Sequence, residues 1–291
     1  MKRFQKHLIV VFATVLWAAS SPAETLTFIA TGPAAPGLSP LNENPPHPTS
    51  SGSGTALVTW DTATTMMTVN AVFNGLTTPD TAAHIHCCTT TPGGNAGVAT
   101  TVPFFPGFPI GVTSGTYSHT FDMLNAASYN PAFVTAHGGT PASAAAALLA
   151  GILAGQAYLN IHSMMFPAGE IRGFLAIPVD ISIKPDATPP VPINAGSNGK
   201  IPVAILSTPT FNAVTSVDPS SLTFGRTGNE KSLAFCNTGG EDVNGDGLPD
   251  LVCHFQTQMT GFQSGDTVGI LKGKTVQGAQ IIGQEAIVVV P

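Results

Sequence analysis

The sequence predicts an all-β protein with two β-sandwich domains in tandem, the first carrying one short alanine-rich helix. Only 9% of the 291 residues are Asp, Glu, Lys or Arg, against about 25% in an ordinary soluble domain, so long helices with charged outer faces are excluded. Gly and Pro contribute 31 and 25 residues between short apolar stretches, as in strands joined by turns. Ten basic against sixteen acidic residues leave no basic patch, which argues against a nucleic-acid partner.

Residues 1–23 have the features of a secretory signal peptide. Lys2, Arg3 and Lys6 precede an apolar run, and small residues close the segment. The run is too short to span a bilayer, which disfavours a membrane anchor. The segment holds three of the ten basic residues and no acidic one, so cleavage takes the net charge from −6 to −9. We expect a secreted or periplasmic protein with no membrane span after cleavage, in which disulfides form.

The first domain is predicted over residues 24–178. Residues 55–60 and 66–73 alternate apolar and polar side chains and are separated by a short polar turn, which is typical of a strand pair. Residues 157–162 and 169–175 form a second expected antiparallel pair.

One helix is expected between these two strand pairs. Thr140 suits the N-cap, Pro141 suits the first helical position, and residues 142–153 are rich in Ala and Leu. The segment carries no charge, so we expect it to lie against the sheet or beneath a loop.

The second domain is predicted over residues 179–291. A proline-rich stretch at 183–192 marks the boundary. The spacing of the later apolar segments suits a sandwich of about 110 residues. The expected strands are 200–206, 222–224, 251–255, 267–271 and 286–290.

A calcium loop is predicted in the second domain. Oxygen-bearing side chains stand at positions 1, 3, 5 and 9 of the segment 242–250, with a glycine at position 6. Calcium takes six to eight oxygens in flexible geometry, which this pattern can supply. The alternative is a polar turn that needs no metal. The expected ligands are Asp242, Asn244, Asp246, Asp250 and the carbonyl of Leu248.

Cys236 and Cys253 flank this loop, and we expect them to form a disulfide. Such a bond is worth about 3 kcal/mol through loop-closure entropy. A disulfide and a calcium ion that fix the same loop indicate a structural role rather than a catalytic one.

A second metal site, for copper or zinc, is predicted at three histidines. Residues two apart on a strand share a face, so His84 and His86 point the same way, with Cys88 as an accessory candidate. The strand at 157–162 can bring His162 beside them, and β scaffolds build copper and zinc sites from such sets. Alternatively, the histidines are core residues bonded to the backbone. Cys87 and Cys88 form a vicinal disulfide, bind metal, or are free thiols.

Four motifs in order resemble the CHRD domain, a family named after chordin and found in exported bacterial proteins. The resemblance covers about residues 25–177 and implies an extracellular β-sandwich without a settled biochemical activity. Cys87-Cys88 stands where glycine is more usual, and residues 164–168 form an apolar version of the usual Asn-Pro-Gly turn. The loop at 242–250 resembles the calcium loops of dockerin and FG-GAP segments. The four motifs are residues 41–46, 83–86, 158–163 and 169–173.

The His84-Ile85-His86 strand also resembles the His-x-His strand of copper/zinc superoxide dismutases. That resemblance implies copper at His84, His86 and His162, with Arg172 as an accessory residue that steers an anion. No matching zinc subsite is present, so the dismutase hypothesis rests on fold analogy. Glu170 and Arg172 share a strand face, which predicts an ion pair between them.

Three hypotheses for function follow. We favour an exported, non-enzymatic binding or structural module of the cell envelope or matrix, stabilised by calcium, with no catalytic residues and an unidentified protein or matrix partner. The alternative is a copper-dependent redox enzyme of the superoxide dismutase type. An extracellular hydrolase has least support, because neither Gly-x-Ser-x-Gly nor His-Glu-x-x-His is present. The apolar, weakly charged composition is compatible with self-association.

Overall fold

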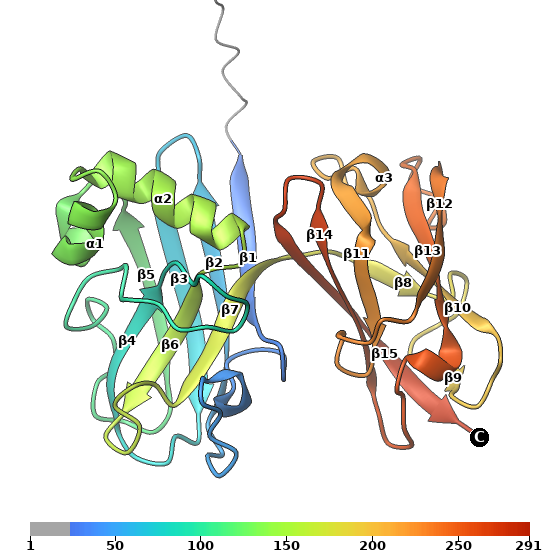
Figure 1. The fold of residues 1–291 in the computed structure, drawn as a ribbon, viewed down its shortest axis with the longest axis horizontal. Helices are drawn as coiled ribbons and strands as arrows, with labels where there is room; N and C mark the ends of the chain where they lie inside the picture. The colour runs from blue at the N-terminus through green and yellow to red at the C-terminus, as the bar shows by residue number, and fades with distance from the viewer. Residues whose placement is uncertain (1–23) are drawn as a thin grey trace, which may run out of the picture.

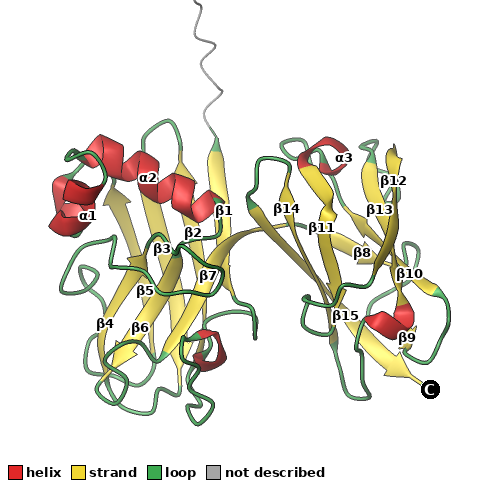
Figure 2. Cartoon of the chain, in the orientation of Figure 1, coloured by secondary structure: helices red, strands yellow, loops and turns green. Residues whose placement is uncertain are grey.

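The computed structural model describes residues 24–291, and the predicted signal segment at residues 1–23 lies outside the described residues. The all-β prediction is confirmed, because strands form most of the regular structure and the helices are few and short (Figure 2). None of the helices described in residues 24–291 is long and apolar enough to cross a bilayer.

The first half of the chain folds into an antiparallel sheet that curls around a core, with α2 beside it (Figure 1). The strands predicted from the two alternating pairs correspond to β2 with β3 and to β6 with β7. The elements are β1 (Thr25–Thr31), β2 (Ser53–Asp61), β3 (Met66–Asn74), β4 (Asp80–His86), β5 (Gly115–Asp122), α1 (Pro131–Ala136), α2 (Pro141–Leu153), β6 (Tyr158–Ser163) and β7 (Ile171–Pro178).

Helix α2 confirms the helix prediction. The Thr140 side chain accepts a hydrogen bond from the Ser143 backbone, and the Ser143 side chain accepts one from the Thr140 backbone, which completes a capping box. Its apolar face buries Ala144, Leu148 and Ile152 in the first core. The uncharged helix therefore closes the sandwich, as its composition requires.

The second half of the chain forms a further set of strands around a separate apolar cluster. One sheet runs β12-β13-β10-β8, while β11, β14 and β15 form the other side. The elements are β8 (Ile181–Ile183), β9 (Val191–Asn194), β10 (Lys200–Ile205), α3 (Ala213–Ser216), β11 (Val217–Gly225), β12 (Leu233–Glu241), β13 (Asp250–Gln256), β14 (Val268–Thr275) and β15 (Gln280–Val290).

Strand β15 joins the two halves. It pairs in parallel with the end of β7, where Ile281 lies opposite Ile177 and Ile282 opposite Pro178. The pairing makes one continuous sheet of β11-β14-β15-β7-β1-β2-β3-β5 across both halves (Figure 1). A small apolar cluster that includes Ala176 and Ile282 packs at this junction.

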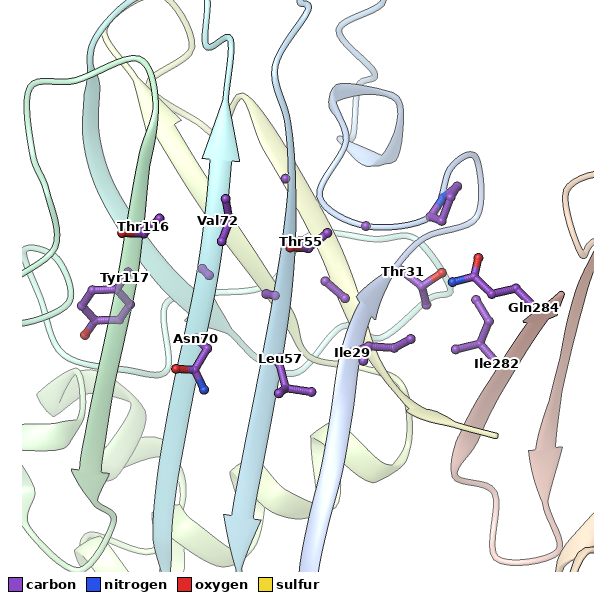
Figure 3. Close-up of a pocket in the computed structure, with 16 residues that line it drawn as sticks. Ile29, Thr31, Thr55, Leu57, Asn70, Val72, Thr116, Tyr117, Ile282 and Gln284 are labelled. Atoms are coloured by element: carbon purple, nitrogen blue, oxygen red, sulfur yellow. The ribbon is translucent and has the colours of Figure 1, made fainter. Parts of the chain in front are cut away.

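An open groove of about 630 Å³ follows the outer face of β1, β2, β3 and β5. Figure 3 shows Leu57 and Asn70 on this face, with Ile282 and Gln284 of β15 beside it. No charged side chain lines the groove within the described part of the chain. Its polar groups are the hydroxyls and amides of outward-facing strand positions.

Candidate metal centre

Strands β4 and β6 bring the three predicted histidines together. In their antiparallel register His162 lies opposite Ala82, two positions before His84. Residues directly opposite each other in a ladder share a face, so His162 points to the same side of the sheet as His84 and His86. All three are buried, with exposed fractions of 5%, 7% and 8% for His84, His86 and His162. The alternation argument therefore predicted the face correctly.

The three imidazoles converge on one point. The Nε2 atom of His162 lies 3.4 Å from Nδ1 of His84 and 3.4 Å from Nε2 of His86. One ligand nitrogen from each ring lies within 4.8 Å of the other two. Among residues 24–291, this is the one group of three or more His, Cys, Asp or Glu side chains gathered so closely.

Backbone carbonyls fix the proton on each ring. Nε2 of His84 donates to the Pro103 carbonyl at 2.7 Å, and Nδ1 of His86 donates to the Ala96 carbonyl at 3.0 Å. Nδ1 of His162 donates to a third carbonyl, that of Pro167, at 3.1 Å. A carbonyl can only accept, so each neutral ring has its proton there and an unprotonated nitrogen at the centre. Metal-bound histidines are oriented in this way by their second nitrogen.

Burial keeps these rings neutral. It lowers the pKa of His84 to about 4, assisted by the neighbouring His162. It lowers the pKa of His86 to about 3, and that of His162 in the same direction. At neutral pH the centre therefore presents three lone pairs and no hydrogen-bond donor between them. This arrangement is repulsive by itself and suits a bound cation.

The segments that supply the three carbonyls cover the outer side of β4 and β6. The long loop after β4 crosses the face of β6 and β7 (Figure 1), and it carries Ala96 and Pro103. The turn between β6 and β7 carries Pro167. The sequence does not predict these contributions, because every residue has a backbone carbonyl and the residue type does not show which carbonyls face the histidines.

Cys88 does not join the histidines. It forms a vicinal disulfide with Cys87, and no cysteine of the described residues is free. Strand β4 ends at His86, so the alternation that would place Cys88 beside the histidines stops before it. The two sulfur atoms instead pack against Gly151 of α2, where a β-carbon would overlap both. The accessory role expected for Cys88 is therefore wrong, and of the alternatives for this pair the disulfide is present.

Arg172 is part of the scaffold around the site. Its side chain is 1% exposed and lies over the Tyr158 ring, with 4.7 Å from Cζ to the ring centroid. Tyr158 in turn stacks on His86, with ring centroids 4.9 Å apart. The guanidinium donates to the carbonyls of Gly93 at 2.7 Å and Gly94 at 3.1 Å. A buried guanidinium held by carbonyls is not open to steer an anion from solvent.

The expected ion pair between Glu170 and Arg172 is not formed. Glu170 instead accepts hydrogen bonds from the Ser50 hydroxyl and the Thr77 amide, both at 2.7 Å. The acidic group beside Arg172 is Glu43, at 3.8 Å. Burial raises the pKa of Glu43 to about 8 although Arg172 acts to lower it, so this carboxyl is mostly protonated at neutral pH.

One further polar residue beside the histidines escaped the sequence reasoning. Asn160 lies directly opposite His84 in the ladder and is 2% exposed. Its Oδ1 atom is buried without a hydrogen-bond partner. Burying an amide oxygen without a hydrogen bond costs folding free energy. The position of Asn160 in the strand that carries His162 is the feature of the sequence that could have indicated it.

The loop at 242–250 folds around its own aspartates. Asp242 accepts hydrogen bonds from the backbone of Gly245 at 2.8 Å and of Gly247 at 2.9 Å. Asp250 is fully buried and accepts from Ser207 and Val243 instead. Asn244 and Asp246 are exposed and hydrogen-bonded to each other at 3.0 Å. In the described residues no backbone N–H outside the helices and strands donates to the Leu248 carbonyl. Calcium binding at this loop stays a prediction.

The predicted disulfide between Cys236 and Cys253 is confirmed. The two residues lie directly opposite each other on β12 and β13. These strands form the hairpin whose connection is the 242–250 loop. The cross-link therefore fixes the base of that loop.

Comparison with known proteins gives one match. Residues 37–175 match the family model of the CHRD domain. No curated protein and no solved structure matches the chain. The matched range contains His84, His86, His162 and Arg172, and it ends before the disulfide and the loop of the second half. The match therefore supports assignment of the histidine-bearing part of the chain to the CHRD domain family.

Proposed function

We propose that the first half of this chain is an exported, non-enzymatic binding module that holds one zinc or copper ion through His84, His86 and His162. The observation that carries the proposal is the convergence of three unprotonated ring nitrogens with no donor among them. Core histidines bonded only to the backbone would also place each ring proton on a carbonyl, but they would have no need to point three lone pairs at one another. Here every available ring proton is already given to a carbonyl.

The spacing of the nitrogens supports a tetrahedral ion. With metal–nitrogen bonds of about 2.0–2.1 Å, two ligands of a tetrahedral ion are about 3.3–3.4 Å apart. The distances from His162 to the other two ring nitrogens are both 3.4 Å. Three protein ligands leave the fourth position for water or for a group from a partner. Imidazole suits both zinc and copper, so the donor set does not select between them.

A binding role fits the surroundings better than redox catalysis. Dismutase chemistry needs a positive funnel toward the metal, and the chain has sixteen acidic against ten basic residues. Arg172, the cation nearest the site in sequence, is buried and held by carbonyls. The CHRD match and the two disulfides support an extracellular setting. The partner, a protein or a matrix component, is unidentified.

We also propose that the 242–250 loop binds calcium and stabilises the second half. Asp242, Asn244 and Asp246 line one exposed turn, and glycines with positive φ at 245 and 247 let the backbone wrap it. Asp250 already ties the loop to Ser207. Calcium would therefore close a turn that is largely formed by hydrogen bonds.

Cobalt(II) tests the histidine site, because tetrahedral cobalt with nitrogen ligands absorbs visible light strongly. We expect the exported chain to bind one equivalent with such bands, and a His162→Ala variant to lose them. His119→Ala is the matched control, since His119 lies on β5 outside the cluster. Absent bands in the wild type, or equal bands in the His162→Ala variant, would refute the proposal. Superoxide consumption by the copper-loaded protein would favour the redox alternative instead.

A further inference from the structure

A second cavity, of about 480 Å³, lies at the junction of the two halves. On one side it is lined by the start of the loop after β4, the residues that directly follow α2, the end of β1 and part of β7. On the other side it is lined by β14 and β15. Its volume lies in the range of small-molecule sites. Both halves of the chain therefore contribute to the cavity.

Positive charge is concentrated in this cavity. Lys272 and Lys274 both line it, and no Asp or Glu does within the described residues. Seven Lys and Arg residues remain beyond position 23, since three of the ten precede it, so two of the seven share one cavity. The two lysines are two apart on β14 and therefore share a face. They can flank one anionic group.

Neither lysine is neutralised by a carboxylate. The close contacts between basic and acidic side chains in residues 24–291 are those of Arg172 with Glu43 and of Arg226 with Asp266. Asp218 lies opposite Lys274 in the ladder, but the two side chains do not form an ion pair. Neither ammonium group therefore has a carboxylate in direct contact.

Lys272 is positioned by neutral oxygens. Its Nζ atom donates to the Gly32 carbonyl at 3.0 Å and to the Asn229 amide oxygen at 3.3 Å. These contacts orient the ammonium group across the junction, and neither of the two oxygens carries a formal negative charge. Burial lowers the pKa of Lys272, and the nearby Glu230 carboxylate acts to raise it, but the two residues do not form an ion pair. A partly buried ammonium group with no carboxylate in direct contact attracts an anion more strongly than an exposed one.

The remaining lining offers an apolar wall. Phe174, Ile281 and Ile282 contribute to it, and threonine hydroxyls from residues 89–91 add neutral polar groups. The groove in Figure 3 also touches Ile282 but is lined by no charged side chain. Charge and apolar surface therefore occur together in the junction cavity and not in the groove.

We propose that the junction cavity binds a small amphipathic anion, with its carboxylate or phosphate between Lys272 and Lys274 and its apolar part on Phe174, Ile281 and Ile282. The anion would contact both halves and hold them in one arrangement. This role is separate from metal binding, because none of the three histidines lines the cavity.

Calorimetry on the exported chain with hexanoate, hexyl phosphate, inorganic phosphate and uncharged hexanamide tests the proposal. We expect at least one hexyl anion to bind, hexanamide not to bind, and inorganic phosphate to bind more weakly than hexyl phosphate. The stronger of the two hexyl anions identifies the charged group. Loss of one charge-assisted contact should weaken binding about tenfold in Lys272→Gln.

Lys274→Gln gives a second test that does not disturb the hydrogen bonds of Lys272, and it should also weaken binding. Lys200→Gln, an exposed change on β10, is the matched control and should bind like the wild type. No binding of either hexyl anion, or equal binding by the wild type and both cavity variants, would overturn the proposal. Lys272 would then be a structural link between the halves only. Hexanamide binding as tightly as hexanoate would also overturn it.

Discussion

The Nε2 atom of His162 lies 3.4 Å from the Nδ1 atom of His84, and neither nitrogen carries a proton to share. The protons of both rings are on the far side, where they meet the carbonyls of Pro167 and Pro103. Two lone pairs at hydrogen-bond distance repel each other unless a cation lies between them. This relationship is the physical basis of the proposed metal site.

Replacing Arg172 should damage both the fold and the site. Arg172→Met leaves the carbonyls of Gly93 and Gly94 unpaired, so we expect a loss of about 3 kcal/mol or more in the free energy of unfolding. The freed loop also carries Ala96, whose carbonyl orients His86, so zinc affinity should fall. Urea unfolding and zinc titration measure the two effects.

Arg226→Met is the control, because Arg226 lies at an exposed ion pair. It should lower the free energy of unfolding by less than about 1 kcal/mol. Equal losses in both variants would contradict this role for Arg172.

The raised pKa of Glu43 predicts how the stability of the protein depends on pH. Burial raises its pKa from 4.5 to about 8, so between these values the unfolded chain is ionised at Glu43 while the folded chain is protonated. The contribution of Glu43 to stability is therefore full below about pH 4.5 and is lost as the pH rises toward 8. Glu43→Gln mimics the protonated form and should gain stability relative to the wild type across this interval. Urea midpoints at several pH values check it, and a constant difference would contradict the raised pKa.

Gly151 is predicted to be indispensable for packing the vicinal disulfide. A β-carbon at this position of α2 overlaps the sulfur atoms of Cys87 and Cys88. Gly151→Ala should lower the free energy of unfolding by about 1–3 kcal/mol, although alanine is the better helix former. In a Cys87→Ala/Cys88→Ala background the same change should cost much less. An equal cost in both backgrounds would show that the sulfur atoms are not the obstacle.

Calcium should raise the melting temperature of the exported chain. A ligand that binds only the folded state adds about 2.7 kcal/mol at a hundred times its dissociation constant. Asp242→Ala removes the side chain around which the loop turns and should abolish the calcium effect. Asp218→Ala is the control, since Asp218 also accepts from a local turn but outside the loop. Thermal unfolding with calcium and with chelator measures this; an unchanged wild-type midpoint would contradict calcium binding.

Much of the fold was predictable because its signals are local. Alternation marked β2, β3, β6 and β7, and the cap at Thr140 marked the start of α2. The pairing of β15 with β7 was not predictable, because Ile281 and Ile177 are distant in sequence and each looks like an ordinary strand residue. Strand β12 was missed, since its polar and glycine-rich sequence carries little apolar alternation.

The three histidines of the candidate site were predictable from the sequence, but the residues that support them were not. Period-two alternation placed His84 and His86 on one face, and the neighbouring strand supplied His162. The same alternation failed for Cys88, because β4 ends before it. The role of Arg172 was also missed, because burial beneath a long loop depends on the path of that loop. Composition gives no information on that path.

Metal content after purification without chelators tests the central claim most directly. Plasma mass spectrometry should find close to one zinc or copper per exported chain. That metal should be lost in His84→Ala and retained in His119→Ala, with both variants folded by circular dichroism. Wild-type protein that contains neither metal, and takes up neither on reconstitution with zinc or copper, would contradict the claim.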